Sequence, residues 1–136
     1  MNVVILTTTR IGRTKGAEDA VRRWSDTGDN VVLVTMYPHD PGIWPLAGVV
    51  ALGAPTTGNR LGKPGRLLVR IFPGSPARQL ARKVRRSADA RAALDAADFV
   101  VAADTPAVAA TYWSSRKHPD VPHISGLASG LQLSKR

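Results

Sequence analysis

The chain has 136 residues, a net charge of +9 and no cysteine, and 43% of its residues are apolar. This length and apolar content suit one domain with one core, and the lack of cysteine excludes disulfides, thiolate nucleophiles and thiolate metal sites. No apolar run approaches the roughly 18 residues of a membrane span, and no leader peptide is evident, so we expect a cytoplasmic protein.

The histidines do not suggest a metal site. They are scattered along the chain, and each lies beside a proline, which indicates turns. A zinc site needs several ligands close together in space. We therefore expect neither a metal nor another cofactor; the three histidines are His39, His118 and His123.

The most informative stretch is a strand, loop, helix and strand over residues 3–37. The apolar runs 3–6 and 31–34 are too far apart for a hairpin, so they are predicted to be parallel, buried strands. Between them, residues 17–24 place apolar side chains on one helical face. Ligands of such folds bind at the carboxyl ends of strands, which points to residues 7–16.

The same alternation continues along the chain. A proline-rich loop over residues 37–45 separates the second strand from the third, and a basic, glycine-rich loop follows the third. Ser75 followed by Pro76 is a helix start signal, and Thr105 followed by Pro106 repeats it. The further expected strands are 49–52, 98–103 and 123–126, and the further expected helices are 67–72, 76–97 and 105–117.

Alternating strands and helices with short connections predict an α/β fold. We expect a Rossmann-like three-layer sandwich with a mostly parallel sheet of about five strands. This domain covers residues 1–126. Residues 127–136 are polar and glycine-rich, so we expect a tail that adds no core and either trails or docks on a partner.

The loop after the first strand carries the candidate ligand-binding residues. Its three cations are Arg10, Arg13 and Lys15, and its glycines, Gly12 and Gly16, allow a phosphate to approach the following helix. The glycine spacing does not match the dinucleotide fingerprint. We interpret Gly12, Arg13, Lys15 and Gly16 as a loop that faces phosphate or substrate; the alternative is a glycine-containing turn with solvated cations.

Positive charge is concentrated in residues 60–91, which contain ten of the nineteen cations and a single acid, Asp89. A polarised distribution of this kind indicates a surface for an anionic partner. The alternative is a solvated helix face, which is what most charge runs are. The candidate residues for binding an anionic surface are Arg66, Arg70, Arg78, Arg82, Arg85 and Arg86.

Among the acids near strand ends, Asp104 is the most suggestive. It directly follows the expected strand 98–103 and precedes a helix start. Its predicted role is to cap that helix. A general base is the weaker alternative, which makes Asp104 the weak catalytic candidate of this chain.

Several short segments follow one order along the chain: residues 3–6, 10–13, 15–18 and 28–35, and then residues 98–104, an Ala-rich helix and residues 122–124. In this order the chain resembles the N-terminal domain of GT-B glycosyltransferases of the family 4 type. Members commonly have a glycine pair where this chain has Lys15 and Gly16, so only Gly16 carries over as a residue that faces donor phosphate or acceptor. Ala103 stands where some members have a histidine.

The resemblance implies the acceptor-side half of an enzyme that transfers a hexosyl group in a cleft between two domains. The family's second domain, which binds the nucleotide-sugar donor, has no counterpart in these 136 residues. If this chain is an enzyme, it is therefore expected to be a glycosyltransferase that acts only with a donor-binding partner chain and is inactive alone.

Two other classes of function stay open. One is a non-catalytic module that keeps the fold and binds an anionic ligand or a protein. The other is peripheral attachment to the anionic inner face of a membrane through residues 67–72 and 78–86. Nucleic acid is the less favoured polyanion, because the aromatic residues do not interleave with the cations along the sequence.

A partner chain or a second copy of this chain is expected at the strand ends, over residues 8–16, 37–45 and 104–106. Ile43 and Trp44 would otherwise leave an apolar patch exposed there. The alternative is that the proline-rich loop folds over Trp44 and covers it.

Overall fold

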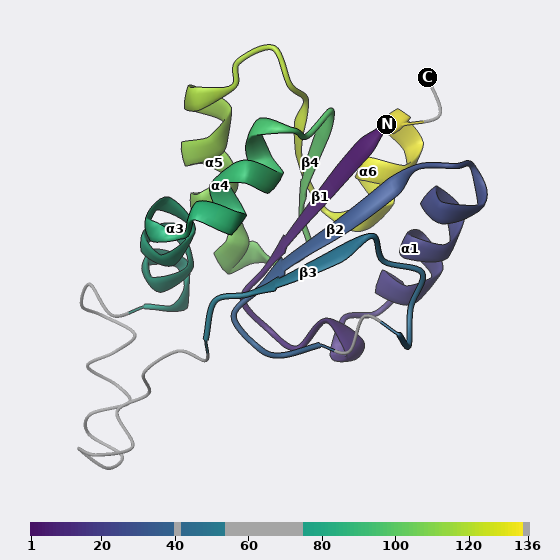
Figure 1. Cartoon of the computed structure of the whole chain (residues 1–136), viewed down its shortest axis with the longest axis horizontal. Coiled ribbons are helices and arrows are strands. Elements are labelled where there is room, and N and C mark those ends of the chain that lie inside the picture. The colour runs from purple at the N-terminus through teal and green to yellow at the C-terminus, as the bar shows by residue number, and fades with distance from the viewer. Residues whose placement is uncertain (40–41, 54–74, 135–136) are drawn as a thin grey trace.

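The computed structural model describes residues 1–39, 42–53 and 75–134, and these form a parallel sheet covered by helices on both faces (Figure 1). The sheet of the described residues has five strands, all parallel, in the order β3-β2-β1-β4-β5. This confirms the expected Rossmann-like fold. The strands are β1 (Asn2–Thr7), β2 (Asn30–Thr35), β3 (Gly48–Ala51), β4 (Phe99–Ala102) and β5 (His123–Ser125).

Helices pack on the two faces of the sheet as two separate layers. On one face lie α1 (Ala17–Asp26) and α6 (Leu127–Ser134), and on the other lie α3 (Pro76–Arg86), α4 (Ala88–Asp95) and α5 (Val108–Lys117). Two short 3-10 helices, η1 (Ile11–Arg13) and η3 (Thr105–Ala107), follow β1 and β4. No helix among the described residues is long and apolar enough to cross a bilayer.

The two cores explain why the strand sequences are continuous apolar runs. Alternate residues of β1 point to opposite faces, so Val3 and Ile5 pack in the core with Trp24, whereas Val4 and Leu6 pack in the core on the other face. A parallel strand covered on both faces has no solvent side, and it therefore needs no polar alternation. The expected helix 67–72 lies outside the described residues.

The expected single helix 76–97 is two helices, so this prediction is wrong. Ser87 separates α3 from α4 with an extended backbone (ψ 120°), and its hydroxyl accepts a hydrogen bond from the amide of Ala90 at 3.1 Å. A serine followed by an acid in the next turn is a typical helix start, here with Asp89 in the first turn of α4. Ala88, the first residue of α4, is exposed.

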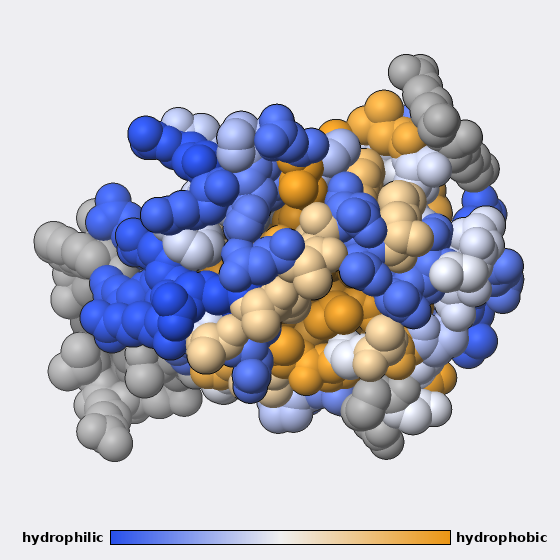
Figure 2. All heavy atoms as spheres, turned by 45° about the horizontal axis from the view of Figure 1, so that its top comes forward, coloured by the Kyte–Doolittle hydropathy of each residue, from blue (hydrophilic) through white to orange (hydrophobic). Residues whose placement is uncertain are grey.

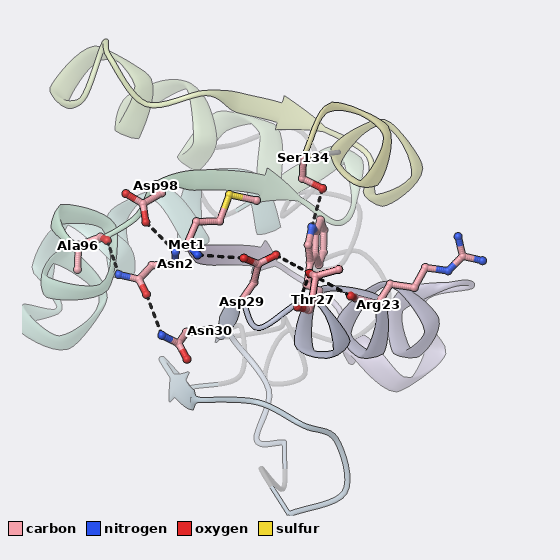
Figure 3. Close-up of polar contacts among 10 residues, drawn as sticks. Met1, Asn2, Arg23, Thr27, Asp29, Asn30, Ala96, Asp98 and Ser134 are labelled. Atoms are coloured by element: carbon pink, nitrogen blue, oxygen red, sulfur yellow. Dashed lines mark hydrogen bonds and ion pairs between the residues drawn. The ribbon is translucent and has the colours of Figure 1, made fainter. Parts of the chain in front are cut away.

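The expected polar tail is also wrong over most of its length, because residues 127–134 form α6. Leu127 and Gly130 are buried against the sheet, and the indole Nε1 of Trp24 on α1 donates a hydrogen bond to Ser134 Oγ at 2.9 Å (Figure 3). Helical spacing relates Leu127, Gly130 and Leu131, which is a weak signal for a helix. The polar composition of the segment favours a tail and is the stronger signal in the sequence.

Polar side chains close the amino-terminal edge of the sheet (Figure 3). The amide of Asn2 donates to Asp98 Oδ2 at 2.8 Å, and its side-chain Nδ2 donates to the carbonyl of Ala96 at 3.0 Å. Asn30 Nδ2 donates to Asn2 Oδ1 at 3.2 Å. The starts of β1, β2 and β4 are therefore joined by the chain's own polar groups.

Replacing Gly130 by valine tests the close packing of α6. A Cβ at this position would lie 3.0 Å from Val101 Cγ2, so the helix would have to move away from β4. We expect Gly130→Val to lower the free energy of unfolding by about 1–3 kcal/mol, measured by urea denaturation. Ala128→Val is the matched control, because Ala128 is exposed on the same helix; an equal effect of both variants would contradict the packing.

The burial and the hydrogen bonds of the His123 ring predict that the protein loses stability in acid. Nδ1 donates to the carbonyl of Val121 at 2.6 Å, which leaves Nε2, 2.9 Å from Ser114 Oγ, to accept from that hydroxyl in the neutral ring. Burial lowers the pKa of His123 below 6.5; the charge of His118 adds to this, and the hydrogen bond with Val121 opposes it.

A histidine with a lowered pKa binds fewer protons in the folded state than in the unfolded state. The contribution of the neutral His123 ring to the free energy of unfolding is therefore complete above pH 6.5, and it is lost as the pH falls below that value toward the folded-state pKa. We expect the unfolding free energy of the parent protein to fall over this range in urea titrations. His123→Gln should show a shallower dependence, and an unchanged slope would contradict the assignment.

Candidate functional site

The carboxyl-terminal edge of the sheet has a split between β1 and β4. The chain leaves β1 toward α1 on one face and leaves β4 toward α5 on the other (Figure 1). The two loops therefore diverge at neighbouring strands, and in open α/β sheets this switch point is where ligands bind.

A pocket of about 640 Å³ lies at this switch point. It is formed by the loop after β1, one residue of the loop after β2, the turn after β4 and the first residue of α3. The expected strand ends 8–16, 37–45 and 104–106 thus each contribute to it. The lining residues are Thr8, Thr9, Arg10, Arg13, Tyr37, Pro76 and Pro106.

Two arginines supply the charge of the pocket. Arg10 and Arg13 are exposed, and within the described part of the chain neither forms an ion pair. The guanidinium carbon of Arg10 lies 5.4 Å from the centre of the Tyr37 ring, which is a cation–π contact that orients the side chain. Among the described residues, no carboxylate lines this pocket.

Asp104 fixes the loop that carries these arginines. Its Oδ2 accepts from Thr7 Oγ1 at 2.7 Å and from the amide of Thr8 at 2.9 Å, and Oδ1 accepts from Thr8 Oγ1 at 2.9 Å. The amide and the hydroxyl of Thr9 add two longer contacts, each 3.3 Å, to Oδ2. One carboxylate after β4 thus holds three consecutive threonines at the end of β1.

The same carboxylate caps the turn that follows it. Asp104 Oδ1 accepts from the amide of Ala107 at 3.0 Å, which confirms the predicted capping role. Both oxygens are engaged by donors of the chain itself. These contacts account for an acid at this position without a proton-transfer step.

The remaining residues of the expected phosphate-facing loop line a different hollow. Gly12, Lys15 and Gly16 lie around a space of about 380 Å³ beside Trp44, with Arg13 on the border between the two hollows. Glu18 and Asp19 line it too and pair with Arg22 and Arg23 at 2.9 and 3.0 Å. Two carboxylates make this second space less favourable for an anion than the switch-point pocket.

The two glycines of that loop differ in their backbone requirements. Gly16 precedes α1 with a φ of 80°, a left-handed conformation that favours glycine. Gly12 has no such φ, and a Cβ there would meet nothing within 4 Å. Gly16 is therefore needed for the backbone, whereas Gly12 is not.

Sequence reasoning missed the contribution of Tyr37 and gave Arg10 no place among the named site residues. The signal for both was their position, because each follows a predicted parallel strand at the same edge of the sheet. Their contact joins the ends of β1 and β2, and only the strand order places these ends side by side.

The basic surface runs along α3, away from the pocket. Arg78, Arg82, Arg85 and Arg86 are exposed, and within the described residues no carboxylate pairs with them. Figure 2 shows a broad hydrophilic surface on the side where Figure 1 places α3. Arg66 and Arg70, the other two candidates, lie outside the described residues.

Trp44 is covered by its own chain. It is 7% exposed, packs in the core with α1, and its ring centre lies 4.7 Å from that of His39. Of the two alternatives for this loop, the structure shows the one in which Trp44 is buried. Ile43 remains 62% exposed.

The described residues contain no group of three or more His, Cys, Asp or Glu side chains that could hold a metal ion. No protein-family model matches this chain, and neither a curated protein nor a solved structure matches it significantly.

Removing the Asp104 carboxylate should loosen the loop after β1. We expect Asp104→Ala to lower the unfolding free energy by about 2 kcal/mol, since hydrogen bonds to a charged group are lost and their donors stay partly buried. Hydrogen exchange should speed up at the amides of Thr8 and Ala107. Asp120→Ala, at an exposed acid, is the control; unchanged exchange at Thr8 would contradict the described role of Asp104.

Proposed function

We propose that this chain is a Rossmann-like domain that binds a small anionic ligand in the switch-point pocket. The observation that carries the proposal is the pair Arg10 and Arg13 in a pocket whose described lining residues include no carboxylate, at the edge of the sheet where such folds bind ligands. Guanidinium groups contact phosphate and carboxylate groups through two parallel hydrogen bonds. The amides and hydroxyls of Thr8 and Thr9 contact Asp104, so the arginines supply the contacts to the anion.

A phosphorylated small molecule suits this pocket best. The pocket has a volume of about 640 Å³, which falls in the range of roughly 300–1,000 Å³ that small-molecule sites occupy. Tyr37 lines the pocket beside the cations, so a sugar or a base can contact its ring. A sugar phosphate or a nucleotide combines these two features.

The second candidate function is the acceptor-side domain of a GT-B-like glycosyltransferase. It is favoured by the position of the pocket, since the resemblance places the strand ends of this domain opposite a donor-binding domain. In this proposal the pocket holds the acceptor, and hexosyl transfer requires a partner chain that binds the nucleotide-sugar donor. Purified alone, the 136-residue chain should not turn over any nucleotide sugar.

Neutralising the arginines tests anion binding directly. We expect Arg10→Gln and Arg13→Gln each to weaken the binding of glucose 6-phosphate or uridine monophosphate by roughly tenfold, because each removes a charged hydrogen-bond donor. Isothermal titration calorimetry measures this loss.

Lys15→Gln is the matched control for these variants. Lys15 belongs to the same loop but lines the neighbouring hollow, so its loss should change affinity little. A loss in Lys15→Gln as large as in Arg13→Gln would place the anion at the start of α1 and contradict the switch-point site. If neither probe binds to the parent protein, the proposal as a whole is overturned.

A further inference from the structure

A second hollow, of about 500 Å³, lies on the helical layer formed by α3, α4 and α5. It shares no lining residue with the switch-point pocket. Arg85 comes from the end of α3, Arg91 from α4, and Trp113, Lys117 and His118 from α5 and its C-terminal cap. Three segments of the chain thus bring charge and one indole ring to a single concave surface.

The positive charge of this hollow is largely uncompensated. Asp95 is the one carboxylate among its described lining residues, and Asp95 Oδ1 lies 3.0 Å from His118 Nε2. Within the described residues no acid pairs with Arg85, Arg91 or Lys117. Arg91 Nε donates to the carbonyl of Ser87 at 3.4 Å, which holds the side chain and leaves its other nitrogens to contact an anion.

Trp113 gives the hollow an aromatic wall. The residue is half-buried: one part packs against the core beneath α5, and another part lines the hollow. Along the sequence it is far from the arginines, and only the packing of α5 beside α3 places the ring next to them. An aromatic ring and cations in one hollow offer the two contacts that nucleotide binding uses. The base stacks on the ring, and the cations bind the phosphate.

We infer that this hollow binds a nucleotide unit, with its base against Trp113 and its phosphate held by Arg85, Arg91 and Lys117. The unit is either a free nucleotide or one residue of a single strand. This site is additional to the proposed function, because it lies in another part of the molecule. In three dimensions three cations and an aromatic ring line the same hollow, although their spacing in the sequence disfavoured nucleic acid.

Binding is measured by the quenching of tryptophan fluorescence, since Trp24 and Trp44 are buried and Trp113 lines the hollow. The probes are adenosine monophosphate, a short single-stranded oligothymidylate, and heparin, which is a polyanion without bases. We expect both nucleotide probes to quench. Similar affinity per site for both indicates a free nucleotide, and much tighter binding of the oligonucleotide indicates a strand; either result supports the site.

Two variants and two controls locate the binding. Lys117→Gln should weaken nucleotide binding roughly tenfold, and Trp113→Leu should abolish the quenching. Arg116→Gln, which neutralises the neighbouring exposed cation outside the hollow, should leave binding unchanged. Arg10→Gln should leave the quenching of Trp113 unchanged, because Arg10 lines the switch-point pocket and not this hollow.

Three results would overturn the inference. The first is the absence of quenching by either nucleotide probe. The second is equal weakening by Lys117→Gln and Arg116→Gln, which would mean that general positive charge is responsible. The third is heparin binding as tight as that of the oligonucleotide, with no effect of Lys117→Gln. Because Lys117 is exposed, its variant keeps the test decisive even if Trp113→Leu does not fold.

Discussion

The candidate ligand pocket depends on the carboxylate of Asp104. The loops that follow β1 and β4 leave the sheet toward opposite faces, and the amide of Ala103, just after β4, still donates to the carbonyl of Leu6 at 2.9 Å. Asp104 bridges this split by accepting hydrogen bonds from Thr7, Thr8 and Thr9. Arg10 follows the threonines directly, so the position of its guanidinium group depends on this carboxylate.

The two edges of the sheet differ in whether their polar and charged side chains have partners within the chain. At the amino-terminal edge, Asn2, Asn30 and Asp98 use their polar groups on one another or on the backbone. At the carboxyl-terminal edge, Arg10 and Arg13 have no acidic partner among the described residues. Cations without partners near a pocket favour an anionic ligand, because the ligand supplies the missing charge.

The helices therefore differ in whether their arginines form ion pairs. On α1, Arg22 and Arg23 pair with acids one turn earlier, and these surface pairs neutralise that helix. On α3 and α4, Arg85 and Arg91 lack such acids and lie around the hollow with Trp113. Among the described residues, Arg85 and Arg91 therefore add to the net charge of +9 without an acid that pairs with them.

The sequence by itself determined the parallel α/β fold, because strands buried on both faces must be continuous apolar runs, and it also indicated that Asp104 caps a helix. The Ser87 break and the helix over residues 127–134 were present as local signals but were outweighed by longer patterns. Only the tertiary structure joined Asp104 to Thr8, Arg10 to Tyr37, and Trp113 to the arginines of the helical layer. These partners are distant in sequence, and strand order and helix packing decide their proximity, whereas hydrophobic periodicity reports only which face of an element is buried.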